Sequence, residues 1–146
     1  MVHIYTFCDK TLVGKKENKS ANLLCENLYK MNFVIDEVST YSSSFNYENL
    51  TFKNKDLFFL LMQKTSVKLN TILANISSSE LTVNETLKKV VTDNYMRKNV
   101  PLEKEAENEW QIPANAVPIT NPNGKTQGYL LKIADTTIFV LPNNFN

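Results

Sequence analysis

Hydrophobic and polar positions along the first half of the chain predict alternating strands and helices. Two short segments rich in β-branched and aromatic residues, Val2–Phe7 and Phe33–Val38, are predicted strands. Between them, apolar residues recur at spacings of mostly three and four, which predicts an amphipathic helix from an N-cap at Asn18 to a stop at Asn32. Leu57–Met62 (LFFLLM) shows no alternation, as an interior parallel strand covered by helices requires.

The second half of the chain predicts further helices and a closing hairpin. Thr82 and Glu85 form a capping box, and the segments YLLKI and TIFVL flank Ala134-Asp135 as the strands of a hairpin. The helices expected here are one from an N-cap at Asn70 to Ile76, one from the Thr82 cap to about Lys98, and Leu102–Trp110. The whole pattern predicts an α/β fold in a single domain over residues 1–146, with three α/β/α layers, a mostly parallel sheet and a C-terminal antiparallel hairpin.

Composition and charge exclude several classes of function. The chain has 146 residues and a net charge of +1, and Arg97 is its only arginine. Because phosphate clamps and base-edge readers are usually arginines, nucleic-acid binding is not expected. The N-terminus has no signal-peptide pattern and the longest apolar run is too short to span a bilayer, so we expect a cytoplasmic protein without a membrane segment. Cys8, Cys25 and the single histidine, His3, have no metal-ligand spacing, so we expect free thiols and no metal site.

Loops that follow the predicted strands are where we expect a ligand. In an open α/β sheet, ligands bind outside the carboxyl ends of the strands. The loops at that edge are Cys8–Glu17, Ser39–Phe45 and Gln63–Leu69. The helix that begins near Asn18 would direct free N–H groups toward an anion, and Gly14 would let the backbone approach it.

A fourth loop, NPNGKTQG (Asn121–Gly128, the glycine loop), contains two of the three glycines of the chain. Two interpretations stay open. Asn-Pro-Asn-Gly can form a plain turn, in which Pro presets φ and Gly takes the left-handed conformation. The loop can equally fold over the carboxyl edge of the sheet and face a ligand.

This order of loops resembles the amino-terminal domain of the competence-damage-inducible protein A (CinA) family, which is related to the molybdopterin-binding MoaB and Mog domains. In that family the first strand leads into a G-x-x-x-N-[TS]-N turn. The corresponding segment here is VGKKENKSANLL, in which Gly14 and Asn18 match the pattern and Ser20 stands in place of the second Asn. The family's V-P-x-x-A, N-P-x-G-x-x-x-G and L-P pattern is matched from Ile112 to Pro142. The resemblance implies a MoaB/Mog-like fold and the candidate ligand-binding residues Gly14, Asn18, Ser20, Thr71, Asn121, Pro122, Gly124 and Gly128.

One loop departs from the family pattern. After the third strand, the family carries a G-G-x-G-P-T-x-D-D-x-T loop whose amides cradle phosphate and whose aspartates organise a divalent metal. The loop here reads MQKTSVKLNT, without glycine or aspartate, and only Thr71 lies where the closing Thr is expected. Ser43 lies at or near the position of an Asp usual after the second strand. Lys64 and Lys68 can neutralise a phosphate, but they cannot position an attacking water as a metal does.

The resemblance therefore implies a degenerate CinA-type domain that is similar to molybdopterin-binding domains. Such a domain is expected to bind a nucleotide, a pterin phosphate or a partner protein. It is expected to have no hydrolytic activity, no catalytic residue and no metal. The deamidase domain often attached in relatives is not expected. Two alternatives stay open: an active metal-dependent ADP-ribose-type pyrophosphatase, for which Asp9 and Glu17 are the only nearby acids, and a purely structural oligomerisation domain. Relatives commonly form symmetric oligomers, so a homo-oligomer is expected.

Two other groups of residues have simpler interpretations. The acidic run Glu103–Glu109 alternates with Lys, Ala and Asn on a predicted helix, and we interpret it as a solvated face. A set of aromatic residues can stack bases, but residues of this kind in or near core elements are expected to fill the core. The set is Tyr41, Tyr47, Phe52, Phe58 and Phe59.

Overall fold

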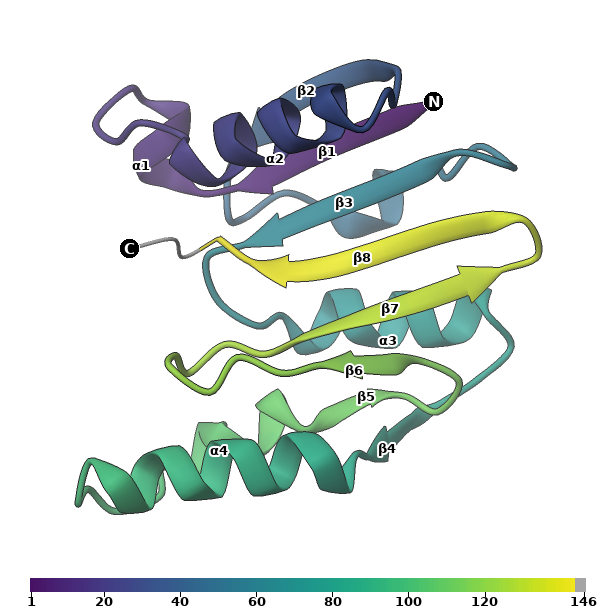
Figure 1. Cartoon of the computed structure of the whole chain (residues 1–146). Helices are drawn as coiled ribbons and strands as arrows, with labels where there is room; N and C mark the ends of the chain where they lie inside the picture. The colour runs from purple at the N-terminus through teal and green to yellow at the C-terminus, as the bar shows by residue number, and fades with distance from the viewer. Residues whose placement is uncertain (144–146) are drawn as a thin grey trace.

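The computed structural model describes residues 1–143. Six strands form one sheet in the order β2-β1-β3-β8-β7-β6, and β4 pairs with β5 separately (Figure 1). The strands are Val2–Phe7 (β1), Ile35–Tyr41 (β2), Leu57–Met62 (β3), Leu81–Val83 (β4), Gln111–Pro113 (β5), Val117–Ile119 (β6), Gly128–Ile133 (β7) and Thr136–Pro142 (β8). The helices are Asp9–Leu12 (α1), Lys19–Lys30 (α2), Val67–Ile76 (α3) and Glu85–Arg97 (α4), with 3₁₀ helices Tyr47–Asn49 (η1) and Lys104–Glu109 (η2).

Helices cover both faces of the sheet. Parallel pairs join β2, β1, β3 and β8, and antiparallel pairs join β8 to β7 and β7 to β6. One core cluster packs Ala21 and Leu28 of α2 against β1 and β3. The other cluster packs α3 and α4 against the opposite face, and Figure 1 shows α2 in front of the sheet and α3 behind it. The predicted α/β fold, with its mostly parallel sheet and its C-terminal hairpin, is confirmed.

Leu57–Met62 is an interior strand, as its uninterrupted apolar run predicts. It pairs in parallel with β1 on one side and β8 on the other. Phe58 and Leu60 point into the core under α3 and α4, whereas Phe59 and Leu61 point into the core under α2. Side chains on both faces of this strand are therefore removed from water, which explains why no polar alternation is found in its sequence.

The helix predicted to follow an N-cap at Asn70 has its N-cap four residues earlier. Its N-cap is Ser66, whose hydroxyl accepts a hydrogen bond from the Leu69 N–H at 3.1 Å. Asn70 lies inside α3 and is buried, and its side-chain oxygen accepts a hydrogen bond from the Tyr129 hydroxyl at 2.6 Å. The prediction of Asn70 as a cap is wrong because this asparagine joins the helix to the sheet.

The Thr82 capping box is also wrong. Thr82 pairs with Ile112 in the β4–β5 ladder, so its backbone is extended. The N-cap of α4 is Asn84, whose side-chain oxygen accepts a hydrogen bond from the Leu87 N–H at 3.0 Å. The β4–β5 pair was not predicted, because each strand is three residues long and its partner lies far along the chain.

Two smaller differences concern the segments around β1 and β2. The loop predicted at Cys8–Glu17 contains the short helix α1. β2 begins at Ile35 rather than at Phe33, because Asn32 has a positive φ of 65° and the Phe33 N–H donates back to the Leu28 carbonyl.

Within residues 1–143, no helix has the length and apolar character needed to cross a membrane.

Candidate ligand-binding site

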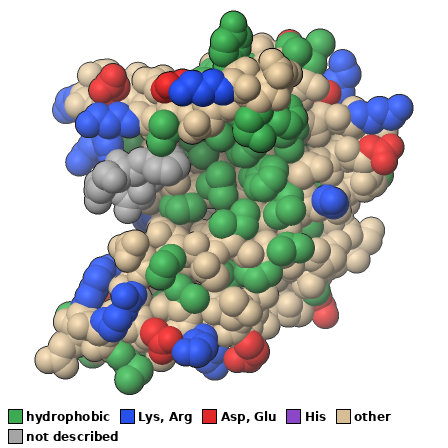
Figure 2. Space-filling view, viewed as in Figure 1, with side chains coloured by type: hydrophobic (Ala, Val, Ile, Leu, Met, Phe, Trp, Pro, Cys, Tyr) green, Lys and Arg blue, Asp and Glu red, His purple; other side chains and the backbone are tan. Residues whose placement is uncertain are grey.

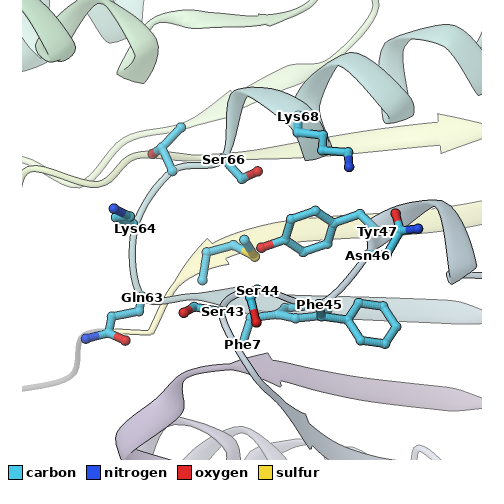
Figure 3. Close-up of a pocket in the computed structure, with 12 residues that line it drawn as sticks. Phe7, Ser43, Ser44, Phe45, Asn46, Tyr47, Gln63, Lys64, Ser66 and Lys68 are labelled. Carbon is cyan, nitrogen blue, oxygen red and sulfur yellow. The ribbon is translucent and has the colours of Figure 1, made fainter.

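A cavity of about 730 Å³ opens at the carboxyl edge of the parallel strands (Figure 3). Phe7, Tyr41 and Met62, the last residues of β1, β2 and β3, are paired in register at this edge. The cavity is lined by Phe7, by residues 43–47 after β2, and by residues 62–66 and Lys68 at the β3–α3 connection. Two of the three loops expected at this edge therefore contribute to its lining.

Aromatic side chains line the cavity on the β1–β2 side. The rings of Phe7 and Tyr47 meet edge to face with centroids 5.2 Å apart, and the centroid of Phe45 lies 5.7 Å from that of Phe7. Tyr41 packs against Phe45 at 4.4 Å. Aromatic faces of this kind can stack on a planar heterocycle, a contact that tolerates many ring types.

The β3–α3 side of the cavity carries hydroxyl and ammonium groups. Figure 3 shows Lys64, Ser66 and Lys68 along this connection, across the cavity from Phe45. The ten-residue helix α3 begins here, directly after its Ser66 cap. Two lysines and the N-terminal turn of a helix favour a negatively charged group at this side.

Asp9 holds the loop after β2 in place without lining the cavity. Its carboxylate accepts hydrogen bonds from the Ser42 hydroxyl at 2.8 Å, from the Ser43 N–H at 3.0 Å and from the Ser43 hydroxyl. These hydrogen bonds, those from Ser43 first, lower the pKa of Asp9 below its ordinary value. Asp9 therefore acts as an ionised anchor for the serines of the cavity wall.

Gly14 and Asn18, predicted from the first loop, lie outside the lining of the cavity. Gly14 has a φ of +77°, and nothing lies within 4 Å of the place where a Cβ would stand. Asn18 caps α2 by accepting a hydrogen bond from the Ala21 N–H, and its amide donates to the Thr6 hydroxyl at 3.0 Å. Asn18 thus ties the start of α2 to β1.

Ser20 and Thr71 also lie outside the lining. Ser20 is buried in α2. The Thr71 hydroxyl donates to the Val67 carbonyl, one turn earlier in α3, at 2.8 Å. In this structure both residues contribute to local helix structure and packing, and their contact with a ligand stays a prediction.

The glycine loop folds around the side chain of Gln127. The side-chain oxygen of Gln127 accepts a hydrogen bond from the Asn121 N–H, and its amide donates to the carbonyls of Asn121 at 2.9 Å and Gly124 at 3.1 Å. The Asn121 amide closes the loop by donating to the Thr126 carbonyl. Three polar side-chain groups thus satisfy the backbone of the loop from within.

The surroundings of the glycine loop fix it from outside. Asn94 and Arg97 of α4 donate to its backbone carbonyls at 3.3 Å and 2.6 Å. A Cβ at Gly128 would lie 2.7 Å from the Val140 carbonyl oxygen, so glycine lets β7 approach β8 closely at this point. Asn121, Pro122, Gly124 and Gly128 do not line the cavity, and their contact with a ligand also stays a prediction.

Glu109 connects the glycine loop to the cavity wall. Its Oε1 accepts hydrogen bonds from the Thr65 hydroxyl and from the Gln127 N–H, the latter at 3.1 Å. Burial raises the pKa of Glu109 above its ordinary value, although both hydrogen bonds act to lower it. The interpretation of the acidic run as a solvated face is wrong for Glu109, which is partly buried next to the buried Trp110.

The sequence did not identify Phe45, Tyr47 and Ser66 as cavity residues. Aromatic residues in this region were expected in the core, and Tyr47 is indeed buried in it, yet its ring also faces the cavity. A local signal for Ser66 was present, because Ser precedes an apolar helical segment. No sequence pattern indicates that the loop after β2 bends its aromatic rings toward the β3–α3 connection.

Neither cysteine forms a disulfide in the structure. Among residues 1–143, no three side chains of His, Cys, Asp or Glu gather closely enough to hold a metal ion.

The fold is similar to that of a solved protein. The crystal structure of the protein CinA, of unknown function, from Thermoplasma acidophilum superposes with a TM-score of 0.72, over 97% of this chain and 87% of that chain, at 13% sequence identity. No protein-family model matches the sequence. No curated protein matches it either. The chain therefore has a CinA-like fold, and at this identity the likeness extends to the fold alone.

Proposed function

We propose that this CinA-like domain binds a small molecule that combines an aromatic heterocycle with a phosphate, such as a nucleotide or a pterin phosphate, and does not hydrolyse it. One observation supports this most directly: a single cavity at the carboxyl edge has aromatic rings on one side and two lysines beside a helix N-terminus on the other. A ring stacked near Phe45 and Tyr47 places an attached phosphate toward Lys64 and Lys68.

The residues around the cavity argue against hydrolysis. Among residues 1–143, no aspartate or glutamate lines it. Cleavage of a pyrophosphate needs neutralised phosphate charge and an oriented, activated water, and Mg²⁺ for this purpose is normally held by carboxylates. The nearby Asp9 already accepts hydrogen bonds from Ser42 and Ser43. Its carboxylate is thus committed to the loop.

A thermal-shift screen with ADP-ribose, related nucleotides and pterin phosphates tests the proposal. A ligand that binds only the folded state must raise the melting temperature. We expect Lys64→Ala and Lys68→Ala each to weaken binding about tenfold, because a hydrogen bond to a charged group contributes about 1.5 kcal/mol or more. The matched control is Lys89→Ala, whose lysine lies exposed on α4 in an ion pair with Asp93. If Lys64→Ala and Lys68→Ala bind the ligand as tightly as the control Lys89→Ala, the proposal is contradicted.

The enzyme alternative has its own test. Purified protein is incubated with ADP-ribose and Mg²⁺, Mn²⁺ or Co²⁺, alongside Asp9→Ala and Glu17→Ala variants. We expect no turnover at an enzyme-like rate. Robust metal-dependent turnover that vanishes in either variant would replace the binding function by that of a pyrophosphatase. If no compound of the screen raises the melting temperature, the purely structural alternative is favoured instead.

A further inference from the structure

The glycine loop reaches the cavity through one carboxylate. Glu109 Oε1 accepts a hydrogen bond from the N–H of Gln127, the residue around which the glycine loop is built. The same oxygen accepts a hydrogen bond from the hydroxyl of Thr65, which lines the cavity. Two segments more than fifty residues apart in the chain thus share a single acceptor atom.

The charge of Glu109 is not explained by packing. Within residues 1–143, Glu109 takes part in no ion pair, whereas Glu103, the N-cap of the same 3₁₀ helix, pairs with Lys125. A glutamine at this position would accept the same two hydrogen bonds without burying a charge. A partly buried carboxylate without a cation, next to a cavity, is more typical of a functional residue than of a structural one.

We propose that Glu109 is a positioning residue of the ligand cavity, which holds Thr65 and the glycine loop in one arrangement. The glycine loop then influences a bound ligand through Glu109 rather than by contact. An ionised carboxylate accepts somewhat stronger hydrogen bonds than an amide oxygen, so ionisation of Glu109 adds to a hold on Thr65 that the acceptor atom itself provides. The effect on ligand affinity rests on the function proposed above, whereas the connection between the two loops does not.

Hydrogen exchange of the full chain without ligand tests the connection. We expect Glu109→Ala to speed backbone exchange about tenfold or more in both residues 63–66 and residues 121–127, because a lost hydrogen bond to a charged group contributes about 1.5 kcal/mol or more. Glu109→Gln keeps both acceptor contacts and should stay within about threefold of the wild type, since a neutral hydrogen bond contributes about 1 kcal/mol. Glu107→Ala is the matched control, because Glu107 is exposed on the same 3₁₀ helix, and it should change neither segment.

A further variant shows whether the effect travels through Glu109. Gln127→Ala removes the side chain inside the glycine loop but keeps the Gln127 N–H that donates to Glu109. It should speed exchange in residues 121–127 and leave residues 63–66 unchanged. Unchanged exchange of residues 63–66 in Glu109→Ala overturns the proposal. If Glu109→Ala does not fold, Thr65→Val removes one of the two contacts, and unchanged exchange in both segments then overturns it.

Ligand affinity gives the second readout. With a ligand from the thermal-shift screen, we expect Glu109→Ala to bind about tenfold more weakly and Glu109→Gln to recover most of that loss, for the same energetic reason. An affinity unchanged in Glu109→Ala contradicts a positioning role even if the loops loosen. If the wild type binds no ligand, the proposed function fails, while the exchange data still decide whether Glu109 connects the loops.

Discussion

His3 lies between two carboxylates at the start of β1. Its Nδ1 is 3.0 Å from Glu37 Oε1 on β2, and its Nε2 is 2.7 Å from Asp56 Oδ2 just before β3. A neutral imidazole has one N–H, so only the doubly protonated ring can donate to both carboxylates. Burial alone would lower the pKa of His3, but the hydrogen bonds and charges of Asp56 and Glu37 outweigh it and raise this pKa above its ordinary value.

We expect the free energy of unfolding to depend on pH through His3. Because the pKa is raised in the folded state, the stabilisation is fully present below the unfolded pKa of about 6.5 and is lost as pH rises through the folded value. Chemical denaturation at several pH values measures this, and His3→Gln should flatten the alkaline decline. Other charges near His3 include Asp36, Lys53 and, through Asp56, the N-terminal ammonium. An alkaline decline as steep in His3→Gln as in the wild type would assign it to another group.

Gly128 is a second residue whose role is decided by one contact. We expect Gly128→Ala to lower the free energy of unfolding by about 1–3 kcal/mol, because a Cβ there would overlap the Val140 carbonyl and force β7 away from β8. Denaturant unfolding gives the value. Gly124→Ala is the control: the atoms nearest to its new Cβ belong to the Asn121 side chain rather than to the backbone, so the loss should be smaller. A loss at position 124 as large as at position 128 would contradict this explanation.

At the scale of elements, the caps of the helices make a direct test. Asn84→Ala should lower the free energy of unfolding by about 1 kcal/mol, because the Leu87 N–H loses its partner at the start of α4. Thr82→Ala is the matched change two residues earlier, on a solvent-exposed position of β4, and should cost markedly less. Thermal or denaturant unfolding of the two variants compares them. If Thr82→Ala is the more damaging change, the capping box predicted from the sequence is the better description.

At the scale of the whole molecule, one face of the sheet stays only partly covered. Figure 2 shows apolar side chains gathered over the middle of the sheet, beside α2. Leu130 and Phe139 are paired across β7 and β8 on the α2 side of the sheet, and Val117 on the neighbouring β6 is 57% exposed. Exposed apolar patches of this kind commonly mark interfaces. We expect this face to bury itself against a second copy of the chain.

Light scattering across micromolar concentrations measures this self-association. Val117→Glu places a charge on the patch and should shift the protein toward the monomer, because an unpaired charge at an interface is costly to bury. Val13→Glu is the control, since Val13 is exposed after α1 and belongs to neither core cluster. If the wild type is a monomer throughout the concentration range, the expectation is contradicted. If the two variants have equal effects, the interface does not include the patch around Val117.

The sequence by itself determined the elements whose signal is local. Leu57–Met62 is apolar on both faces and becomes the interior strand, the spacing around Leu24 and Leu28 produces α2, and Ala134-Asp135 turns the closing hairpin. These signals succeed because strand and helix periodicity and turn conformation depend on neighbouring residues. Because the strands could be predicted from local signals, the loops that follow them at the carboxyl edge could be identified as well. These loops mark the part of the molecule where the cavity opens.

Tertiary structure alone decided which residues of those loops meet. Asn70 does not cap a helix, because its side chain contacts Tyr129, which lies far along the chain. Thr82 does not cap a helix either, because it pairs as a strand residue with the distant Ile112. Glu109 is partly buried rather than fully solvated, because Thr65 and Gln127 both donate hydrogen bonds to it. The physical reason is common to these cases: polar side chains and backbone groups take the partners that packing between distant segments brings to them, and no local pattern records those partners.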